Sequence, residues 1–310
     1  MLNATRLTLR LHRFEVVAFV ALSLLLTAAA WLVASRLDAV GFSAACIDRT
    51  GAGVPPSCER LAQTFYDLAS SEASPIQSFI VIVPFIAAIL LGVTVVGREV
   101  ERGTTRLAWS LAPSRRRWLL ARLVPIAVLI AVGTYALGVA ADRLLGASEP
   151  DIDTANAFAM FGFRGVALAA RVFFVFALAV LVGTAMGRVM PAVIVAAILA
   201  WFGISGGERV HDEILQRETV VVASDAVKTG DRQFDQRFQL PDGSLIGWQE
   251  MEQIDPPTGD NWRPKYPMVS LIIPGARYRQ VELREVAALA GGTLVAVVAT
   301  AFVVARRRPS

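Results

Sequence analysis

One serine lies within Gly203-Ile204-Ser205-Gly206-Gly207, which matches the G-x-S-x-G pattern that can carry a nucleophilic serine. Such a serine needs a neighbouring base, and the nearest candidates along the chain are His211 and Asp212. The pattern also requires a strand before the serine, whereas a long apolar stretch of helical character precedes this one. We therefore expect small residues at a helix end here and predict no catalytic residue in the chain.

Nucleotide sites of the P-loop type and zinc sites of the HExxH type both have recognisable sequence patterns. A phosphate-binding P-loop contains Gly-Lys-Ser/Thr, but the only lysines, Lys228 and Lys265, follow a valine and a proline. A zinc site of the HExxH type needs two histidines on one helix turn, and the only histidines are His12 and His211. The sequence therefore predicts no nucleotide site of the P-loop type, no cofactor and no metal site in this chain.

The composition indicates a membrane protein. Of the 310 residues 55% are hydrophobic and only 18% are charged, and the mean hydropathy is +0.54. A transmembrane helix needs about 20 apolar residues, and six stretches qualify: 16–35, 76–97, 123–141, 163–187, 189–207 and 286–305. We predict an all-α polytopic membrane protein with six transmembrane helices. The second helix is expected to have Ser74 as its N-cap and Pro75 at its first position.

Arginine is distributed unevenly among the segments that join these stretches. The segments on one side hold 14 arginines and three acidic residues: 1–15, 98–122, residue 188 and 306–310. Because basic residues mark the cytoplasmic side, we expect both termini in the cytoplasm and 36–75, 142–162 and 208–285 outside it. Anionic headgroups account for arginines at span ends. We therefore expect the lipid bilayer as a partner and no nucleic acid.

The two cysteines of the chain, Cys46 and Cys58, both lie in the external segment 36–75. Disulfides persist outside the cytoplasm, and a bridge that closes this loop would contribute roughly 3 kcal/mol to stability. We expect a disulfide, with two inert thiols as the alternative.

The long external segment 208–285 contains strand patterns. Thr219–Ala223 is rich in β-branched residues, and Phe234–Leu240 and Leu245–Trp248 flank Pro241-Asp242-Gly243 in the manner of a hairpin. We predict a small β-containing external domain between the fifth and sixth transmembrane helices. A flexible tether is the alternative.

The cytoplasmic segment 98–122 carries an amphipathic pattern. Apolar residues recur at helical spacing between Glu99 and Leu111, and Ser114 is suited to cap the next helix. We predict a short helix over this stretch that docks onto a cytoplasmic partner, with anchoring at the membrane surface as the alternative. A second amphipathic helix is expected within 1–15, lying at the membrane surface before the first span.

In their order and topology these features resemble the permeases of bacterial type-2 ABC exporters. The sequence Gly97-Arg98-Glu99-Val100-Glu101-Arg102-Gly103-Thr104 is similar to that family's Gly-x-Glu-x-Glu-x-Gly-Thr segment, and Leu11-His12-Arg13-Phe14-Glu15 is similar to its connector helix. The resemblance extends to the two-cysteine loop, to Phe163-Arg164-Gly165-Val166 and to Pro274-Gly275-Ala276-Arg277-Tyr278. It does not extend to 208–273.

The resemblance implies a permease subunit of an exporter in the bacterial cell membrane. In that family a coupling helix contacts a separate cytoplasmic ABC ATPase subunit, which would bind ATP and magnesium. A second permease subunit, identical or different, would pair with this one. The coupling residues would then be Glu99, Glu101, Arg102, Gly103, Thr104, Thr105, Arg106 and Leu107.

Two arginines interrupt the fourth apolar stretch. Arg171 follows Arg164 by seven residues, so on a helix both would lie on one face, about 10 Å apart along the axis. A charge inside a membrane is costly unless it is paired, and Glu282 and Glu285 near the sixth stretch are the candidate partners. We expect structural ion pairs, with contact to substrate in the translocation pathway as the alternative.

Two other functions remain open at this stage. A membrane sensor or scaffold would bind a ligand with the external domain and would have no ATPase partner. An intramembrane serine protease is the other, because rhomboid proteases also have six spans and a G-x-S-G sequence like Gly203–Gly206. The sixth stretch, however, lacks the histidine that a rhomboid protease would carry there.

Overall fold

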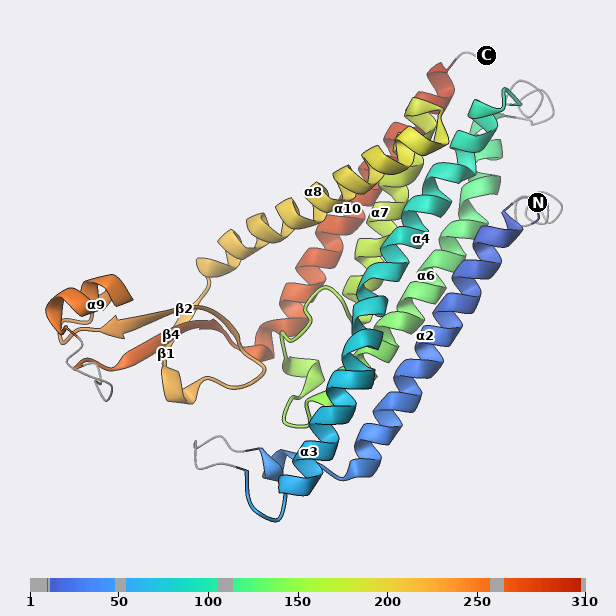
Figure 1. Ribbon diagram of the computed structural model, residues 1–310. Coiled ribbons are helices and arrows are strands. Elements are labelled where there is room, and N and C mark those ends of the chain that lie inside the picture. Colours follow the sequence, from blue (N-terminus) through green and yellow to red (C-terminus); the bar gives the residue numbers. More distant parts are fainter. Residues whose placement is uncertain (1–9, 11, 48–53, 105–113, 257–264, 308–310) are drawn as a thin grey trace. The chain divides into compact units, whose positions relative to one another are not determined.

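The computed structural model of the protein describes residues 10, 12–47, 54–104, 114–256 and 265–307. The chain divides into two compact units. The helical unit consists of Met1–Pro150, Met160–Gly207 and Glu282–Ser310, and the sheet unit of Asp151–Ala159 and Glu208–Val281. The helices labelled in Figure 1 are α2 (Arg13–Val40), α3 (Glu59–Leu68), α4 (Ser74–Glu101), α6 (Arg115–Ser148), α7 (Gly165–Met186), α8 (Val189–Gln216), α9 (Trp248–Ile254) and α10 (Tyr278–Arg306).

Six helices among the described residues are long and apolar enough to cross a membrane. They coincide with the six predicted stretches, so the predicted fold class is confirmed. All of them except α7 continue past the apolar stretch, and α6 is the longest single α-helix with 34 residues. At 1.5 Å per residue α6 is about 50 Å long, against about 30 Å of hydrocarbon. Its polar ends therefore extend beyond the hydrocarbon core.

The second span begins earlier than the sequence predicts. A π-helical turn, Ala69–Ala73, joins α3 directly to α4, and Ser74 itself has helical dihedral angles. The expectation that Ser74 caps the helix is therefore wrong, and the helix is unbroken from Glu59 to Glu101. Pro75 has no N–H to donate to a preceding turn. A wider π turn just before it lets the helix continue without that donor.

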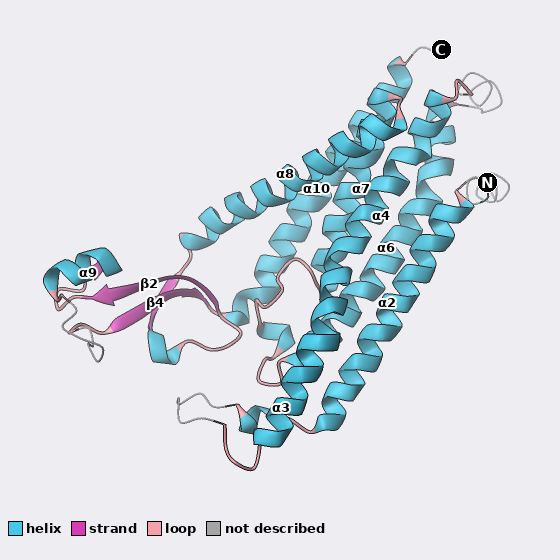
Figure 2. Cartoon of the chain, in the orientation of Figure 1, coloured by secondary structure: helices cyan, strands magenta, loops and turns pink. Residues whose placement is uncertain are grey.

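Four helices, α2, α4, α6 and α7, pack together in the helical unit (Figure 2). Glycines bring α4 and α7 close together. A Cβ added to Gly92 would lie 2.7 Å from the Ala179 Cβ, and one added to Gly183 would lie 2.6 Å from the Val93 carbonyl oxygen. Small residues at crossings are a common way for membrane helices to gain contact area. By comparison, α8 and α10 are the least buried of the six spans.

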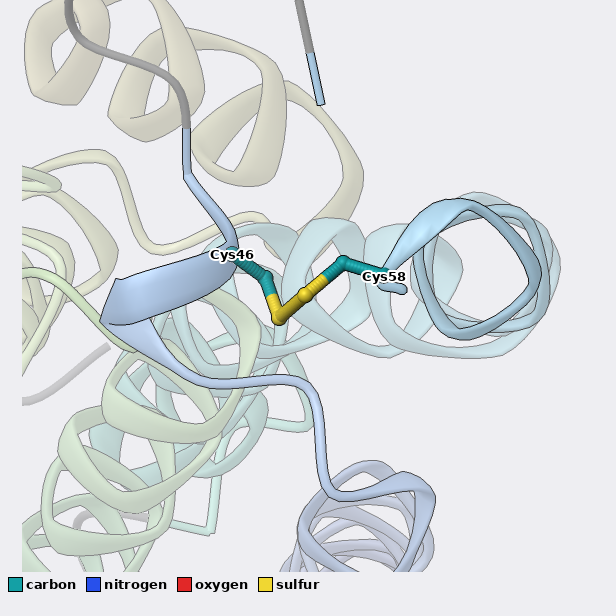
Figure 3. The surroundings of a disulfide bond; sticks show 2 residues. All are labelled: Cys46 and Cys58. Atoms are coloured by element: carbon teal, nitrogen blue, oxygen red, sulfur yellow. A yellow bond between two sulfur atoms is a disulfide. The ribbon is translucent and has the colours of Figure 1, made fainter. Parts of the chain in front are cut away.

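Cys46 and Cys58 form a disulfide, as predicted (Figure 3). Cys46 ends the 3-10 turn Ala44–Cys46 that follows α2, and Cys58 immediately precedes α3. The rings of Phe42 and Phe65 stack with 4.6 Å between their centroids and join the same two segments. The segment after α2 is thus fixed to the start of the second span.

The sheet unit contains four antiparallel strands in the order β1-β4-β2-β3. Their bounds are β1 (Val220–Ala223), β2 (Arg232–Gln239), β3 (Leu245–Ile246) and β4 (Met268–Ile273). The predicted hairpin is confirmed, because β2 pairs with β3 and Phe238 lies opposite Ile246. Gly243 has a φ of 87° in the turn between them. The sequence patterns did not predict β4, although it is the strand that pairs with both β1 and β2.

A second piece of chain, between α6 and α7, belongs to the same sheet unit. The Phe158 N–H donates to the Gly230 carbonyl oxygen (2.9 Å), and the Phe158 ring meets the Tyr278 ring edge-on at 5.6 Å. Thr229 Oγ1 donates to the Asp151 carboxylate (2.9 Å). The β-containing region therefore includes Asp151–Ala159, which the sequence analysis assigned to a separate loop.

Candidate functional site

The first residues of the predicted coupling helix, Glu99–Leu111, belong to α4 and to the turn that follows it. Glu99 and Glu101 belong to the last turn of α4, and Arg102, Gly103 and Thr104 form the turn that follows. Gly103 has a φ of 67°, which glycine adopts without strain. The prediction of a short helix that begins at Glu99 is wrong at that end, because the span helix continues through these residues. The other predicted coupling residues lie outside the described part of the chain: Thr105, Arg106 and Leu107.

The segment ends in α6, which begins as the sequence predicts. Ser114 is the N-cap of α6, and its Oγ accepts a hydrogen bond from the Arg117 N–H (3.2 Å). Such caps typically contribute about 1 kcal/mol. The side chains of Arg116 and Arg117 are exposed, whereas Trp118 is buried. The first turn of α6 therefore turns one face to the protein and the other outward.

Two ion pairs join the helix ends that flank this segment. Glu15 of α2 lies 2.5 Å from Arg98 of α4, and Glu99 of α4 lies 2.5 Å from Arg122 of α6. The guanidinium of the buried Arg122 also lies 5.6 Å from the centre of the Trp118 ring. Pairs removed from water are screened less than exposed ones. The ends of α2, α4 and α6 are thus held together by charge as well as by packing.

His12, the residue before α2, is buried beside these pairs. Burial disfavours the charged imidazole and is the main cause of a pKa for His12 below its ordinary value of 6.5. Arg98 and Arg122 lower the pKa further, while Glu15 raises it. His12 is therefore mainly neutral at pH 7, and the charge balance of the cluster rests on the glutamates and arginines.

The same segment also contacts α8 and α10. The Glu101 carboxylate accepts a hydrogen bond from the N–H of Val189, the first residue of α8 (3.3 Å). Arg115, the first residue of α6, donates through Nη1 to three carbonyl oxygens at the end of α10, at 2.9 to 3.4 Å: those of Val304, Ala305 and Arg307. We call this part of the helical unit, where α2, α6 and α8 begin and α4 and α10 end, the arginine-rich end.

The structure pairs Arg171 with one of the two predicted partners. The Arg171 Nε lies 2.5 Å from the Glu285 carboxylate, and the arginine side chain is only 2% exposed. Its guanidinium lies 5.0 Å from the centre of the Phe163 ring and fills the space that a Cβ on Gly162 would need. A charge so enclosed is costly unless it is paired. The contact joins α7 to α10.

Arg164 is placed differently from the prediction. It precedes α7 as the N-cap, with an extended backbone, so it does not share a helix face with Arg171. Its Nη1 lies 2.5 Å from the Asp142 carboxylate of α6. The expectation of a common face is wrong because α7 begins only at Gly165.

Glu282 lies in the same region and is buried. Its Oε1 is 3.3 Å from the point where a Cβ on Gly165 would lie, and the Asp142 Oδ2 is 3.2 Å from that point. A side chain at position 165 would therefore press on both carboxylates. Glycine at this position leaves room for the charged groups.

Ser205 does not stand on a nucleophile turn. It lies inside α8, which is helical both before and after it. Asp212, a candidate partner, accepts a hydrogen bond from Arg232 (2.6 Å) within the sheet unit. The geometry that a hydrolase serine requires is therefore not formed.

Several residues of these contacts were not assigned to a site from the sequence. Arg115, Arg122 and Asp142 lie at the ends of apolar stretches, where charged residues are expected at any membrane surface. A buried charge needs a partner. A search for partners of Glu99 and Arg164 could therefore have found Arg122 and Asp142.

The family model described as ABC-2 membrane transporter related matches residues 17–205, which is more than half of the chain. The match includes the segment between α4 and α6 and ends before the sheet unit segment Glu208–Val281. The search among curated proteins and the search among solved structures found no match.

Proposed function

The chain belongs to the ABC-2 membrane transporter related family, and on that premise we propose that it is the permease subunit of an ATP-driven exporter. In this proposal the chain forms the translocation pathway. A separate ABC ATPase subunit binds ATP and magnesium and hydrolyses the nucleotide. A second permease subunit, identical or different, completes the pathway.

The observation that carries the proposal is the attachment of the segment between α4 and α6. The Glu99–Arg122 ion pair joins the end of α4 to the start of α6, on the two sides of the segment, and the Arg98–Glu15 pair joins α4 to α2. A displacement of these joined helix ends would pass to the helices, because the contacts between packed elements are stiff. This is the mechanical property that a docking site for an ATPase needs.

The charge distribution supports the orientation. The arginine-rich end would face the cytoplasm, because basic residues are retained there during insertion. Both termini would then be cytoplasmic, and the disulfide and the sheet unit would lie outside the bacterial cell membrane. A disulfide is compatible with that side and is rare on the cytoplasmic one.

We further propose that Arg164, Arg171, Glu282 and Glu285 serve the structure of the permease. The buried pairing of Arg171 with Glu285 and of Arg164 with Asp142 supports this role. A group that binds substrate in the pathway would be expected to face an accessible space, whereas Arg171 is enclosed by Gly162 and Phe163.

The experiment is affinity purification of the full-length chain from its native membrane in mild detergent. An ATP-binding subunit should co-purify with the unsubstituted chain and be lost from G103P/T104P, because proline cannot adopt the positive φ of Gly103. The matched control is E252A/Q253A on the exposed face of α9 in the sheet unit, which should retain the subunit. Absence of any ATP-binding subunit from the unsubstituted chain would overturn the proposal.

A further inference from the structure

Two arginines at the arginine-rich end bind the C-terminal ends of other helices. Arg115 donates to the last carbonyls of α10, and Arg307, just after α10, donates to the carbonyls of Thr184 and Ala185 at the end of α7. The two arginines therefore connect the first residue of α6 to α10, and the end of α10 to α7.

Helix ends are suited to such contacts. The last four carbonyl groups of an α-helix have no partner within the helix, and the helix dipole places partial negative charge there. A guanidinium offers five N–H donors in a planar fork and stays charged at every physiological pH. One arginine can thus bind several carbonyls of one helix end, as Arg115 does.

The second contact is built closely into the end of α7. Gly187 ends that helix in a left-handed conformation, with a φ of 68°. The Arg307 guanidinium and the Val100 side chain occupy the space that a Cβ on Gly187 would need. Arg307 and Val100, in the last turn of α4, therefore both approach the end of α7.

The helix joined through Arg115, α10, has the smallest buried share of its apolar part among the six spans. Its charged contact with α7 at Glu285 lies more than four helical turns from Arg306. At the arginine-rich end, where Val304 of α10 is buried in the core, the contacts of Arg115 and Arg307 add hydrogen bonds that tie α10 to α6 and α7.

We infer that Arg115 and Arg307 form an arginine relay, which carries a displacement of the coupling segment to the ends of α10 and α7. The inference rests on the proposed function, in which a docked ATPase displaces that segment. Both arginines are positioning residues, because they act on helix ends and not on a substrate. Their neighbours Arg116, Arg117 and Arg306 are exposed and are not part of the relay.

The first measurement tests the contact in the chain alone. Both native cysteines are joined in the disulfide, so introduced cysteines are the only free thiols to carry spin labels. Labels at R116C and R306C in the full-length chain, in lipid nanodiscs, should give a narrow distance distribution. R115A should broaden it, R115K should broaden it less, and the matched control R117A should leave it narrow. An unchanged distribution in R115A overturns the relay.

The second measurement tests the transmission of movement in the complex with the ATPase. Labels at R13C and R306C should show a distance shift when ATP is added. R115A should lose this shift while the ATPase still co-purifies, and R117A should keep both. A shift that persists in R115A overturns the relay and leaves the proposed function standing. Failure of the ATPase to bind the unsubstituted chain overturns the proposed function and the relay with it.

A second variant covers the case in which R115A does not fold. R307A removes the contact with α7 and leaves the Arg115 side chain in place. With labels at R13C and M186C, ATP should shift the end of α7 in the otherwise unsubstituted complex and in the exposed control R306A, but not in R307A. An ATP-dependent shift of normal size in R307A contradicts the relay.

Discussion

The Arg171–Glu285 ion pair buries two charges in the first turns of α7 and α10, where the apolar stretches of these helices begin. Each charge would be costly there alone, and their mutual attraction offsets a large part of the desolvation of both. Gly162 and Phe163 enclose the guanidinium, so the arginine cannot extend to the membrane surface. The guanidinium and the carboxylate therefore need each other as partners.

This dependence predicts the effect of removing one partner. R171Q leaves the Glu285 carboxylate buried without its cation, and we expect a loss of about 3–5 kcal/mol in the free energy of unfolding. The double variant R171Q/E285Q should recover most of that loss, because it removes both charges of the pair. Denaturant unfolding of the purified protein in detergent measures both changes.

An exposed pair provides the control. Arg237 and Asp235 lie 2.8 Å apart on β2, with side chains 44% and 49% exposed. R237Q should change the free energy of unfolding by about 1 kcal/mol or less, since water screens such pairs. Equal losses in R171Q and R237Q would contradict the structural role of the buried pair.

The sequence identified the charged residues in the apolar stretches but only part of their pairing. The pairing of Arg171 with Glu285 was predictable, because an arginine within an apolar stretch requires an acidic partner nearby. The partner of Arg164 was not, because Asp142 appeared to lie in a loop and is in fact on an extended α6. Where a helix ends decides which charges meet, and the apolar pattern does not mark that end.

Helices α4 and α7 meet through glycines, so enlarging one of these glycines should weaken the packing of the two helices. A Cβ on Gly183 would lie 2.6 Å from the Val93 carbonyl oxygen, which is backbone and cannot move aside. G183A should force the helices apart and lower the free energy of unfolding by about 1–3 kcal/mol. Thermal unfolding in detergent measures the change.

Gly206 of α8 is the matched control for this substitution. No heavy atom lies within 4 Å of the Cβ that alanine would add there. G206A should be neutral or stabilise the helix by up to about 1 kcal/mol, because alanine has the higher helix propensity. Comparable destabilisation by G183A and G206A would show that the crossing does not depend on the glycine.

Elements with local signals were predictable, and those with distant partners were not. The β2–β3 hairpin has its whole signal within a few residues around Gly243, and the structure confirms it. The strand β4 pairs with β1 and β2, whose residues precede it by more than 25 positions, so no turn pattern marks it. Pro75 led to the opposite error, because the sequence predicted that a helix begins there. In the structure a π turn before Pro75 lets the helix continue through it.

The whole molecule consists of two units that the chain enters and leaves several times. The sheet unit takes one short segment, Asp151–Ala159, and one long segment, Glu208–Val281. The family match ends at residue 205, before the long segment. We therefore expect that a substitution in the core of one unit lowers the stability of that unit and leaves the stability of the other unchanged.

Phe158 tests this expectation. Its buried ring packs against Tyr278, so F158A should cost the sheet unit about 3 kcal/mol. Amide exchange measured by mass spectrometry should rise roughly 100-fold in Asp151–Ala159 and Glu208–Val281, with little change in the helical unit. The converse experiment uses G183A, which should raise exchange in α4 and α7 alone. A rise in both units from either substitution would show that they unfold as one.

The disulfide between Cys46 and Cys58 has a consequence for biogenesis. The bond joins the end of the first span to the start of the second. In the proposed orientation it can form only after the loop between them has been translocated. A chain inserted upside down would keep both thiols in a reducing compartment. Alkylation of free thiols in newly made protein would therefore count the misoriented molecules, and the oxidised bond would mark each chain whose first hairpin has been inserted correctly.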